Sequence, residues 1–235
     1  MKLTQKILLA AACFSLTPAY ADEAAIQQKL KQIIPNAPDA KISKSVIPGL
    51  YEVMIGTKVL YIDEGANYAV SGNIINLETR QNLTTAAENK ARKKILSGLD
   101  ESQMIVYPAK GKVKHTLTVF SDIDCPYCRK LHDEIPMLTQ AGFKVRYLAY
   151  PRAGVGSESY HKAVSAWCAT DRVKALDQAM SGKKIPEKTC QNPVMDDMRL
   201  AEEFGVNGTP NILVDTGEFF PGYVPAKELI KRLAN

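Results

Sequence analysis

The feature that most constrains the fold is a short succession of strand, helix and strand in the second half of the chain. Residues His115–Phe120 and Phe143–Ala149 are rich in β-branched and aromatic side chains, which favours strands. A helix is expected between them, from about Pro126 to Gln140. Such a succession within about 35 residues is a βαβ unit with two parallel strands. The second half is therefore predicted to be an α/β domain.

Two cysteines stand where the first of these strands gives way to the helix, in the order Cys125-Pro126-Tyr127-Cys128. Pro126 suits the first helical turn, where its missing N–H would be unpaired anyway. Cys125 is therefore expected at the helix N-terminus, where free N–H groups and the helix dipole stabilise a thiolate. Because the thiolate is the species that attacks disulfides, the pair predicts redox exchange. Cys128 lies one turn on, within reach to resolve a mixed disulfide, and is expected to be the more buried of the two.

Other roles for this pair are weaker. A structural zinc site takes four ligands, and Cys125, Cys128 and His132 supply only three, with no second close pair. A c-type haem needs histidine directly after the second cysteine, where Arg129 stands. A purely structural disulfide stays open, although strained, exposed disulfides tend to be labile. No metal or other cofactor is predicted.

The first half of the chain predicts a small, separate domain. Residues 22–36 carry apolar side chains at helical spacing, and Pro35 ends them. From Leu50 to Leu77 the period changes to two, which indicates an antiparallel meander. A domain of about 60 residues is marginal alone, and its edge strands need cover, so we expect it to pair with a second copy. The expected strands are Tyr51–Ile55, Val59–Ile62, Tyr68–Val70 and Ile74–Leu77.

Between the two halves, Thr85–Glu88 has capping-box spacing and predicts a helix that runs to Leu96 and ends near Gly98. Its apolar residues are sparse, which favours an exposed linker helix, and Gly98–Lys112 is expected to be a connection. The predicted organisation is therefore an N-terminal domain at 22–82, a linker at 83–112 and a second domain at 113–235. Within that second domain we expect helices at 157–180 and 194–204, strands at 211–214 and 218–220, and a last helix at 225–233.

The first 21 residues predict an export signal. Lys2 and Lys6 precede an apolar run, and Ala19-Tyr20-Ala21 is a small-x-small cleavage site. A lipoprotein signal cut before Cys13 is the weaker alternative. Removal of two lysines and no acid lowers the net charge from +5 to +3, too small a surplus to indicate nucleic-acid binding. No later stretch reaches the roughly 20 apolar residues that a membrane span requires.

After cleavage four cysteines remain, in a compartment where disulfides persist. Cys168 and Cys190 are 22 positions apart, and a structural bridge is favoured over a second redox centre. Among the other polar residues, His132 is expected to face solvent. Asp122 and Asp124 flank the motif and would raise a nearby thiol pKa if they were close.

The chain resembles the DsbC/DsbG family of thioredoxin-like disulfide isomerases over essentially its whole mature length. The resemblance is carried by the two cysteines and by stretches far more specific than they are: Ala24–Gln28, Met104–Tyr107, Thr118–Ile123, Val145–Ala149, Trp167–Ala169, Gly208–Pro210 and Pro221–Tyr223. It implies a V-shaped periplasmic homodimer, joined through cystatin-like N-terminal domains, with two thioredoxin-fold domains that carry a helical insertion. The cleft between them would hold misfolded clients.

The resemblance also implies roles for residues. Cys125 would attack and Cys128 would resolve, while Thr209 and a cis-Pro210 would contact the client backbone beside them. Pro126 and Tyr127, between the two cysteines, would contact the client as well. Cys168 and Cys190 match the family's structural bridge, and the membrane protein DsbD would keep the active pair reduced.

Pro126 is a departure, because the best-known isomerase of this family carries glycine inside the motif and the Pro-Tyr pair is similar to the DsbG branch. Residues between the cysteines tune redox poise. The sequence therefore leaves three activities beside isomerisation: a DsbG-like thiol reductant, a holdase chaperone and a DsbA-like oxidase.

Overall fold

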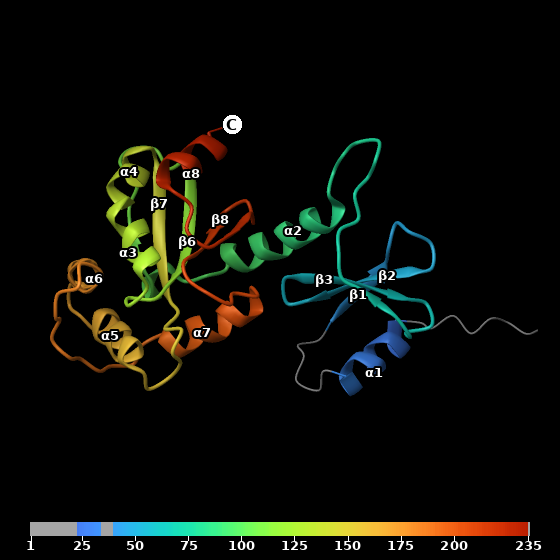
Figure 1. The fold of residues 1–235 in the computed structure, drawn as a ribbon, viewed down its shortest axis with the longest axis horizontal. Helices are drawn as coiled ribbons and strands as arrows, with labels where there is room; N and C mark the ends of the chain where they lie inside the picture. The colour runs from blue at the N-terminus through green and yellow to red at the C-terminus, as the bar shows by residue number, and fades with distance from the viewer. Residues whose placement is uncertain (1–22, 34–39, 235) are drawn as a thin grey trace, which may run out of the picture.

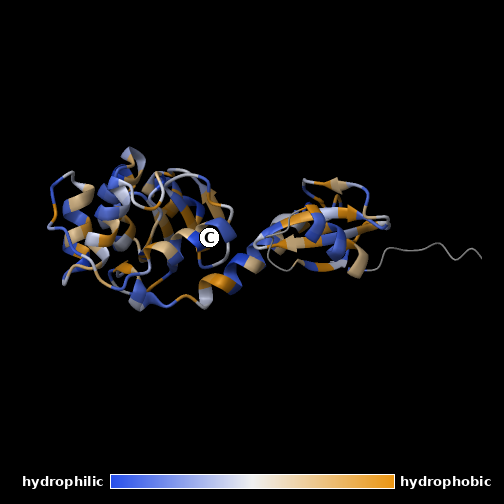
Figure 2. Ribbon diagram, turned by 90° about the horizontal axis from the view of Figure 1, so that it is seen from below, coloured by the Kyte–Doolittle hydropathy of each residue, from blue (hydrophilic) through white to orange (hydrophobic). Residues whose placement is uncertain are grey.

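The computed structural model describes residues 23–33 and 40–234, so the predicted signal peptide and Cys13 lie outside the described residues. The described chain forms two parts joined by a long helix (Figure 1). Hydrophobic residues gather in the strands of both parts (Figure 2). None of the helices in the described ranges is long and apolar enough to cross a bilayer.

The first part is a helix on an antiparallel sheet in the order β1-β2-β3-β4. The predicted helix and the meander of β2, β3 and β4 are confirmed, whereas β1 was not predicted. Ile26 and Leu30 of the helix bury against Val53 and its neighbours on the sheet. The strand predicted at Ile74–Leu77 is wrong: this segment makes one isolated bridge, because the chain turns back and Leu83 N–H donates to Ile74 O. The elements are α1 (Glu23–Ile33), β1 (Lys41–Lys44), β2 (Leu50–Ile55), β3 (Lys58–Asp63) and β4 (Ala69–Val70).

The second part is a sheet in the order β5-β7-β6-β8-β9, in which β6 and β7 are parallel and the other pairs antiparallel. The βαβ prediction is thus confirmed. The strands are β5 (Ile105–Tyr107), β6 (His115–Ser121), β7 (Phe143–Ala149), β8 (Asn211–Val214) and β9 (Phe219–Pro221). The helices are η1 (Glu101–Gln103), α3 (Pro126–Asp133), α4 (Ile135–Gln140), α5 (Glu158–Trp167), α6 (Arg172–Met180), α7 (Val194–Glu203) and α8 (Ala226–Arg232).

Both faces of this sheet are covered, because side chains of β6 and β7 alternate between them. Val119 and Tyr147 belong to the larger cluster, under α3, α4, α5, α6 and α8. Phe120 and Leu148 point to the opposite face and pack against α7 and the end of the long helix. The thiol motif begins α3, so it lies on the side of the larger cluster.

Two expectations for this part need correction. The single helix predicted from Pro126 to Gln140 is divided at Glu134, because Pro136 has no N–H to continue the ladder. The connection expected at Gly98–Lys112 contains η1 and β5, and β5 pairs with β7. Ile105 is 1% exposed, so this short strand is part of the core.

The joining helix, α2 (Leu83–Ser97), begins two residues before the predicted capping box, because the Asn82 side chain accepts from Thr85 N–H and caps it. The expectation that it is exposed is wrong. Leu96 is 2% exposed and packs against the second sheet. Arg92 is 3% exposed, and the pattern of apolar residues could not reveal that this charged side chain is buried.

Candidate active site

Cys125 is the N-cap residue of α3, in extended conformation, and Pro126 follows it in the first turn. Cys128 lies in that turn, and both cysteines are free thiols. Cys128 was predicted to be the more buried of the two. Both residues are 1% exposed, so their accessible surfaces do not show this difference. The central strand β6 ends at Ser121, so only three residues separate the end of the strand from Cys125.

A second loop, which leads into β8, lies beside the thiols. The Thr209–Pro210 peptide bond is cis, and Cys125 Sγ lies 3.3 Å from the carbonyl oxygen of Thr209. The hydroxyls of Thr209 and Ser121 are buried and have no hydrogen-bond partner within the described residues. Each of them is therefore free to turn its O–H toward a thiolate.

The two sulfurs differ in acidity. Burial opposes ionisation of Cys125. Hydrogen bonds that its thiolate would accept from the Thr209 hydroxyl and from the Cys128 and Tyr127 backbone N–H groups outweigh that effect, so the pKa of Cys125 is lowered. For Cys128, burial dominates and raises the pKa to about 12, although the Ser121 hydroxyl opposes the rise. The thiol of Cys125 therefore ionises more readily than the thiol of Cys128.

The two acidic residues beside the motif are neutralised by cations. Asp122 is 3% exposed and accepts hydrogen bonds from Arg152, through both the backbone N–H and Nε. Asp124 pairs with Arg129 at 3.3 Å and Lys162 at 2.9 Å. These cations offset the negative charges of Asp122 and Asp124, which weakens the effect of the two carboxylates on the nearby thiols.

An aromatic surface flanks the motif. Tyr127 is 61% exposed and stacks on Tyr223, with ring centroids 6.1 Å apart. Glu134 holds Tyr223 in place by accepting from its hydroxyl at 2.7 Å, and Lys130 Nζ lies over the same ring. Tyr127 was predicted to contact the client, whereas no role was predicted for Tyr223, Lys130 or Glu134. The helical spacing of Lys130 and Glu134 from Tyr127 was the only available signal.

His132 is not exposed, so the expectation that it faces solvent is wrong. Its side chain is 10% exposed; Nδ1 lies 3.2 Å from the hydroxyl of Tyr147 and Nε2 lies 3.0 Å from Asp177. Both ring nitrogens are therefore engaged. Across the described ranges, no group of three or more His, Cys, Asp or Glu side chains has the arrangement of a metal site.

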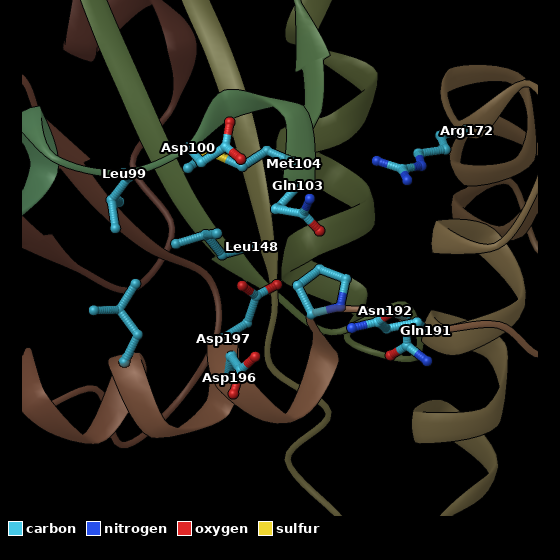
Figure 3. Close-up of a pocket in the computed structure, with 12 residues that line it drawn as sticks. Leu99, Asp100, Gln103, Met104, Leu148, Arg172, Gln191, Asn192, Asp196 and Asp197 are labelled. Carbon is cyan, nitrogen blue, oxygen red and sulfur yellow. The ribbon is translucent and has the colours of Figure 1, made fainter.

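The remaining described cysteines, Cys168 and Cys190, are joined by a disulfide that ties the end of α5 to the segment before α7. A cavity of about 630 Å³ opens near this segment, and Figure 3 shows Asp197 and Leu148 on its wall. No residue of the thiol motif lines it. The Asp197 carboxylate accepts from Ala149 N–H at 2.9 Å, and burial raises its pKa to about 8.

Known proteins match this chain over most of its length. A profile described as a disulfide bond isomerase protein N-terminal domain matches residues 17–85, and one described as a thioredoxin-like domain matches residues 101–235. The thiol:disulfide interchange proteins DsbC of Dickeya dadantii and Escherichia coli are 39% and 37% identical to this chain, over 92% and 90% of it and 88% and 87% of their own lengths. A crystal structure of a disulfide interchange protein from Neisseria gonorrhoeae matches 57% of this chain and 97% of that chain, at 32% identity and a TM-score of 0.50.

A thioredoxin-like sheet with two free thiols at a helix N-terminus, beside a cis-proline loop, defines a thiol:disulfide oxidoreductase. The N-terminal domain narrows the class further. The chain belongs to the DsbC family of thiol:disulfide interchange proteins.

Proposed function

We propose that this chain is a periplasmic disulfide isomerase and reductase, in which Cys125 attacks wrong disulfides of exported proteins and Cys128 resolves the mixed disulfide. The observation that carries the proposal is the difference between the two sulfurs: the pKa of Cys125 is lowered, and that of Cys128 is raised to about 12. At neutral pH Cys125 would attack as a thiolate, while Cys128 would stay protonated until the mixed disulfide has formed.

The proposed chemistry balances without a cofactor. Cys125 thiolate attacks one client sulfur, the client disulfide breaks, and the other client sulfur leaves as a thiolate. Another client thiolate then displaces Cys125, which rearranges the client; alternatively, Cys128 attacks Cys125, which leaves the client reduced by two electrons and the enzyme oxidised. In the second case an external reductant has to restore the thiols, and DsbD is the partner that the family implies.

The cis-proline loop and the motif itself form the proposed client site. Thr209 O lies 3.3 Å from the Cys125 sulfur, and Pro210 follows it across the cis peptide bond. Tyr127, next to Pro126 at the helix start, is 61% exposed. An unfolded client offers extended backbone and apolar side chains, which suit such a border. We assign no role in exchange to the bridge between Cys168 and Cys190.

We further propose that the chain acts as a homodimer joined through residues 22–82, with residues 83–112 as linker and 113–235 as catalytic domain, after removal of a signal peptide at 1–21. Support comes from the first part, where a small core is accompanied by large apolar side chains left in solvent. These are Ile33, Val46, Ile47, Tyr68, Val70, Ile75 and Leu77. A dimer would also form the apolar cleft that chaperone activity requires.

The catalytic proposal is tested by refolding of a client with scrambled disulfides. Cys125→Ser is expected to abolish rescue, and Cys128→Ser to leave mixed disulfides with the client. Rescue by Cys125→Ser at the parent rate would contradict the proposal and favour a holdase. Thiol trapping in cells separates the remaining alternatives, because a mostly reduced pair favours isomerase or reductase and a mostly oxidised pair favours an oxidase.

The dimer is tested by light scattering. Val70, 53% exposed on the short edge strand β4, is changed to lysine, and Val113, 47% exposed in the second part, is changed likewise as control. Val70→Lys is expected to yield monomer and Val113→Lys to leave the dimer. A monomeric parent would contradict the proposal and favour the oxidase alternative.

A further inference from the structure

The turn between β2 and β3 is buried, although it is the tip of a hairpin. Gly56 and Thr57 form a two-residue turn, because the residues on either side of them are paired. Gly56 has φ of +58°, a conformation that such turns require and that glycine adopts without strain. Turn tips generally lie in solvent, yet Thr57 is 0% exposed. A segment outside the hairpin therefore covers this turn.

The cover is the C-terminal end of α7, in the second part of the chain (Figure 1). The last carbonyl groups of a helix have no partner within it. In α7, the carbonyls of Ala201 and Glu202 accept from backbone N–H groups of the residues that follow the helix. The next carbonyl, that of Glu203, accepts from the backbone N–H and from the hydroxyl of Thr57, each at 3.3 Å. The first part of the chain thus completes the cap of a helix in the second part.

The turn and the helix end fit closely. A Cβ built on Gly56 would come 2.8 Å from Glu203 O, which is shorter than an ordinary van der Waals contact. A Cβ built on Gly205, which follows α7, would come 3.1 Å from Lys58 Cε. The side chain of Lys58 therefore lies against Gly205, and its Nζ is 5.7 Å from the centroid of the Phe219 ring in β9.

The joining helix α2 takes part in the same contact region. Glu88 accepts from Val59 N–H at 3.3 Å and pairs with Arg92 at 3.2 Å. Arg92 in turn donates to Gly217 O at 2.8 Å, and its guanidinium lies 5.7 Å from the centroid of the Phe219 ring. Domains joined by a linker move relative to each other unless further contacts hold them. The turn on α7 supplies such contacts in addition to α2.

We propose that the Gly56–Thr57 turn is an anchor that fixes the orientation of the thiol site relative to the first part, and that exchange on protein clients depends on it. This rests on the proposed function. A misfolded protein is large enough to contact apolar side chains of the first part, such as the exposed Ile47, while its disulfide meets Cys125. Binding at two linked sites is strengthened only where the geometry permits both contacts at once. Gly56 and Thr57 are therefore positioning residues, which act through the placement of Cys125.

The anchor is tested first by hydrogen exchange on the full chain, with two alanine variants. Gly56→Ala places its Cβ against Glu203 O and displaces the turn from α7. Gly49→Ala is the matched control, because Gly49 also lies in the first part with a positive φ, +82°, but has nothing within 4 Å of its built Cβ. Mass spectrometry follows exchange at the Thr57 amide. Gly56→Ala is expected to speed that exchange by roughly 10-fold over Gly49→Ala, the scale of losing two hydrogen bonds.

Activity is then measured with a large and a small substrate. Gly56→Ala is expected to refold a client with scrambled disulfides about 3- to 10-fold more slowly than Gly49→Ala, because the competent orientation is populated for less of the time. Reduction of dithiobis(nitrobenzoate), which is too small to contact both parts, should agree within about twofold between the two variants. Thr57→Val removes the hydroxyl donor and should show a smaller loss with the large client, whereas Thr57→Ser keeps the donor and should refold it at the parent rate.

The anchor is overturned if the Thr57 amide exchanges equally fast in both alanine variants, or if Gly56→Ala refolds the client as fast as Gly49→Ala. It is also overturned if reduction of the small disulfide slows as much as refolding, because the defect would then lie at the thiols themselves. A Gly56→Ala monomer beside a Gly49→Ala dimer in light scattering would overturn it as well, since the turn would then belong to the dimer contact. A parent that reduces the small disulfide but does not refold the client would contradict the proposed function, and with it the role of the anchor in exchange.

Discussion

Replacement of Gly217 by alanine tests how firmly the joining helix α2 is docked on the second part of the chain. Gly217 lies in the turn between β8 and β9 with φ of +94°, and a Cβ built there would come 1.9 Å from the carbonyl oxygen of Asn89 in α2. An ordinary contact needs at least 3.4 Å, so the two backbones would have to separate by about 1.5 Å. That movement breaks the 2.8 Å bond from Arg92 Nε to Gly217 O.

The cost follows from a matched comparison. Gly111 has φ of +90° and nothing within 4 Å of its built Cβ, so Gly111→Ala carries the backbone strain alone, roughly 1–2 kcal/mol. Gly217→Ala adds the loss of a hydrogen bond from a charged donor, about 1.5–3 kcal/mol, at a site where Arg92 is 3% exposed. We therefore expect Gly217→Ala to lower the free energy of unfolding by about 2–3 kcal/mol more than Gly111→Ala.

The assay is denaturant unfolding followed by the fluorescence of Trp167. This is the only tryptophan of the sequence, it is 2% exposed, and it ends α5 in the second part of the chain. Equal destabilisation by the two alanine variants would refute the reasoning, because it would mean that α2 moves away from the turn at no cost.

Three further predictions concern the thiols, a buried acid and the disulfide. At neutral pH iodoacetamide should modify Cys125 and spare Cys128, because the pKa of the first is lowered and that of the second raised to about 12; equal labelling in a peptide map would contradict this. Asp197 has a folded-state pKa of about 8, above its usual 3.8, so its ionisation destabilises the fold as the pH rises between these values. Asp197→Asn should therefore gain stability over the parent across that range in chemical unfolding, with no further gain above pH 8, and a constant difference would disprove it. Replacing Cys168 and Cys190 together by alanine should cost about 3 kcal/mol by the loop-entropy relation, checked in the same unfolding assay, and an unchanged midpoint would speak against a stabilising bridge.

Local patterns predicted the parts of the fold that depend on neighbours in the sequence. The βαβ unit, the meander and the position of Cys125 at a helix start all follow from periodicity and from Pro126 in the first turn. The division of the predicted helix at Glu134 could also have been predicted, because Pro136 lies inside the predicted range. The long apolar pattern around Pro136 favoured a single helix instead.

Contacts between distant residues were not predictable in this way. The sequence predicts that Arg92 is exposed to solvent, yet its Nε donates a hydrogen bond to Gly217 O, 125 positions away. His132 finds Asp177 45 positions away, and no short-range pattern marks a histidine for such a partner. The short strand β5 likewise exists because β7 offers it an edge, and its three residues have no periodicity of their own.

The sequence by itself determined which sulfur lies at a helix N-terminus, because the helix start and its dipole are local properties of Cys125 and the residues after it. Only the tertiary structure decided how the two sulfurs differ. Burial under the sheet raises the pKa of Cys128, while Thr209, 84 positions away, brings the hydroxyl that lowers that of Cys125. Desolvation and hydrogen bonding depend on what surrounds an atom in space, and the chain sets those surroundings only once it has folded.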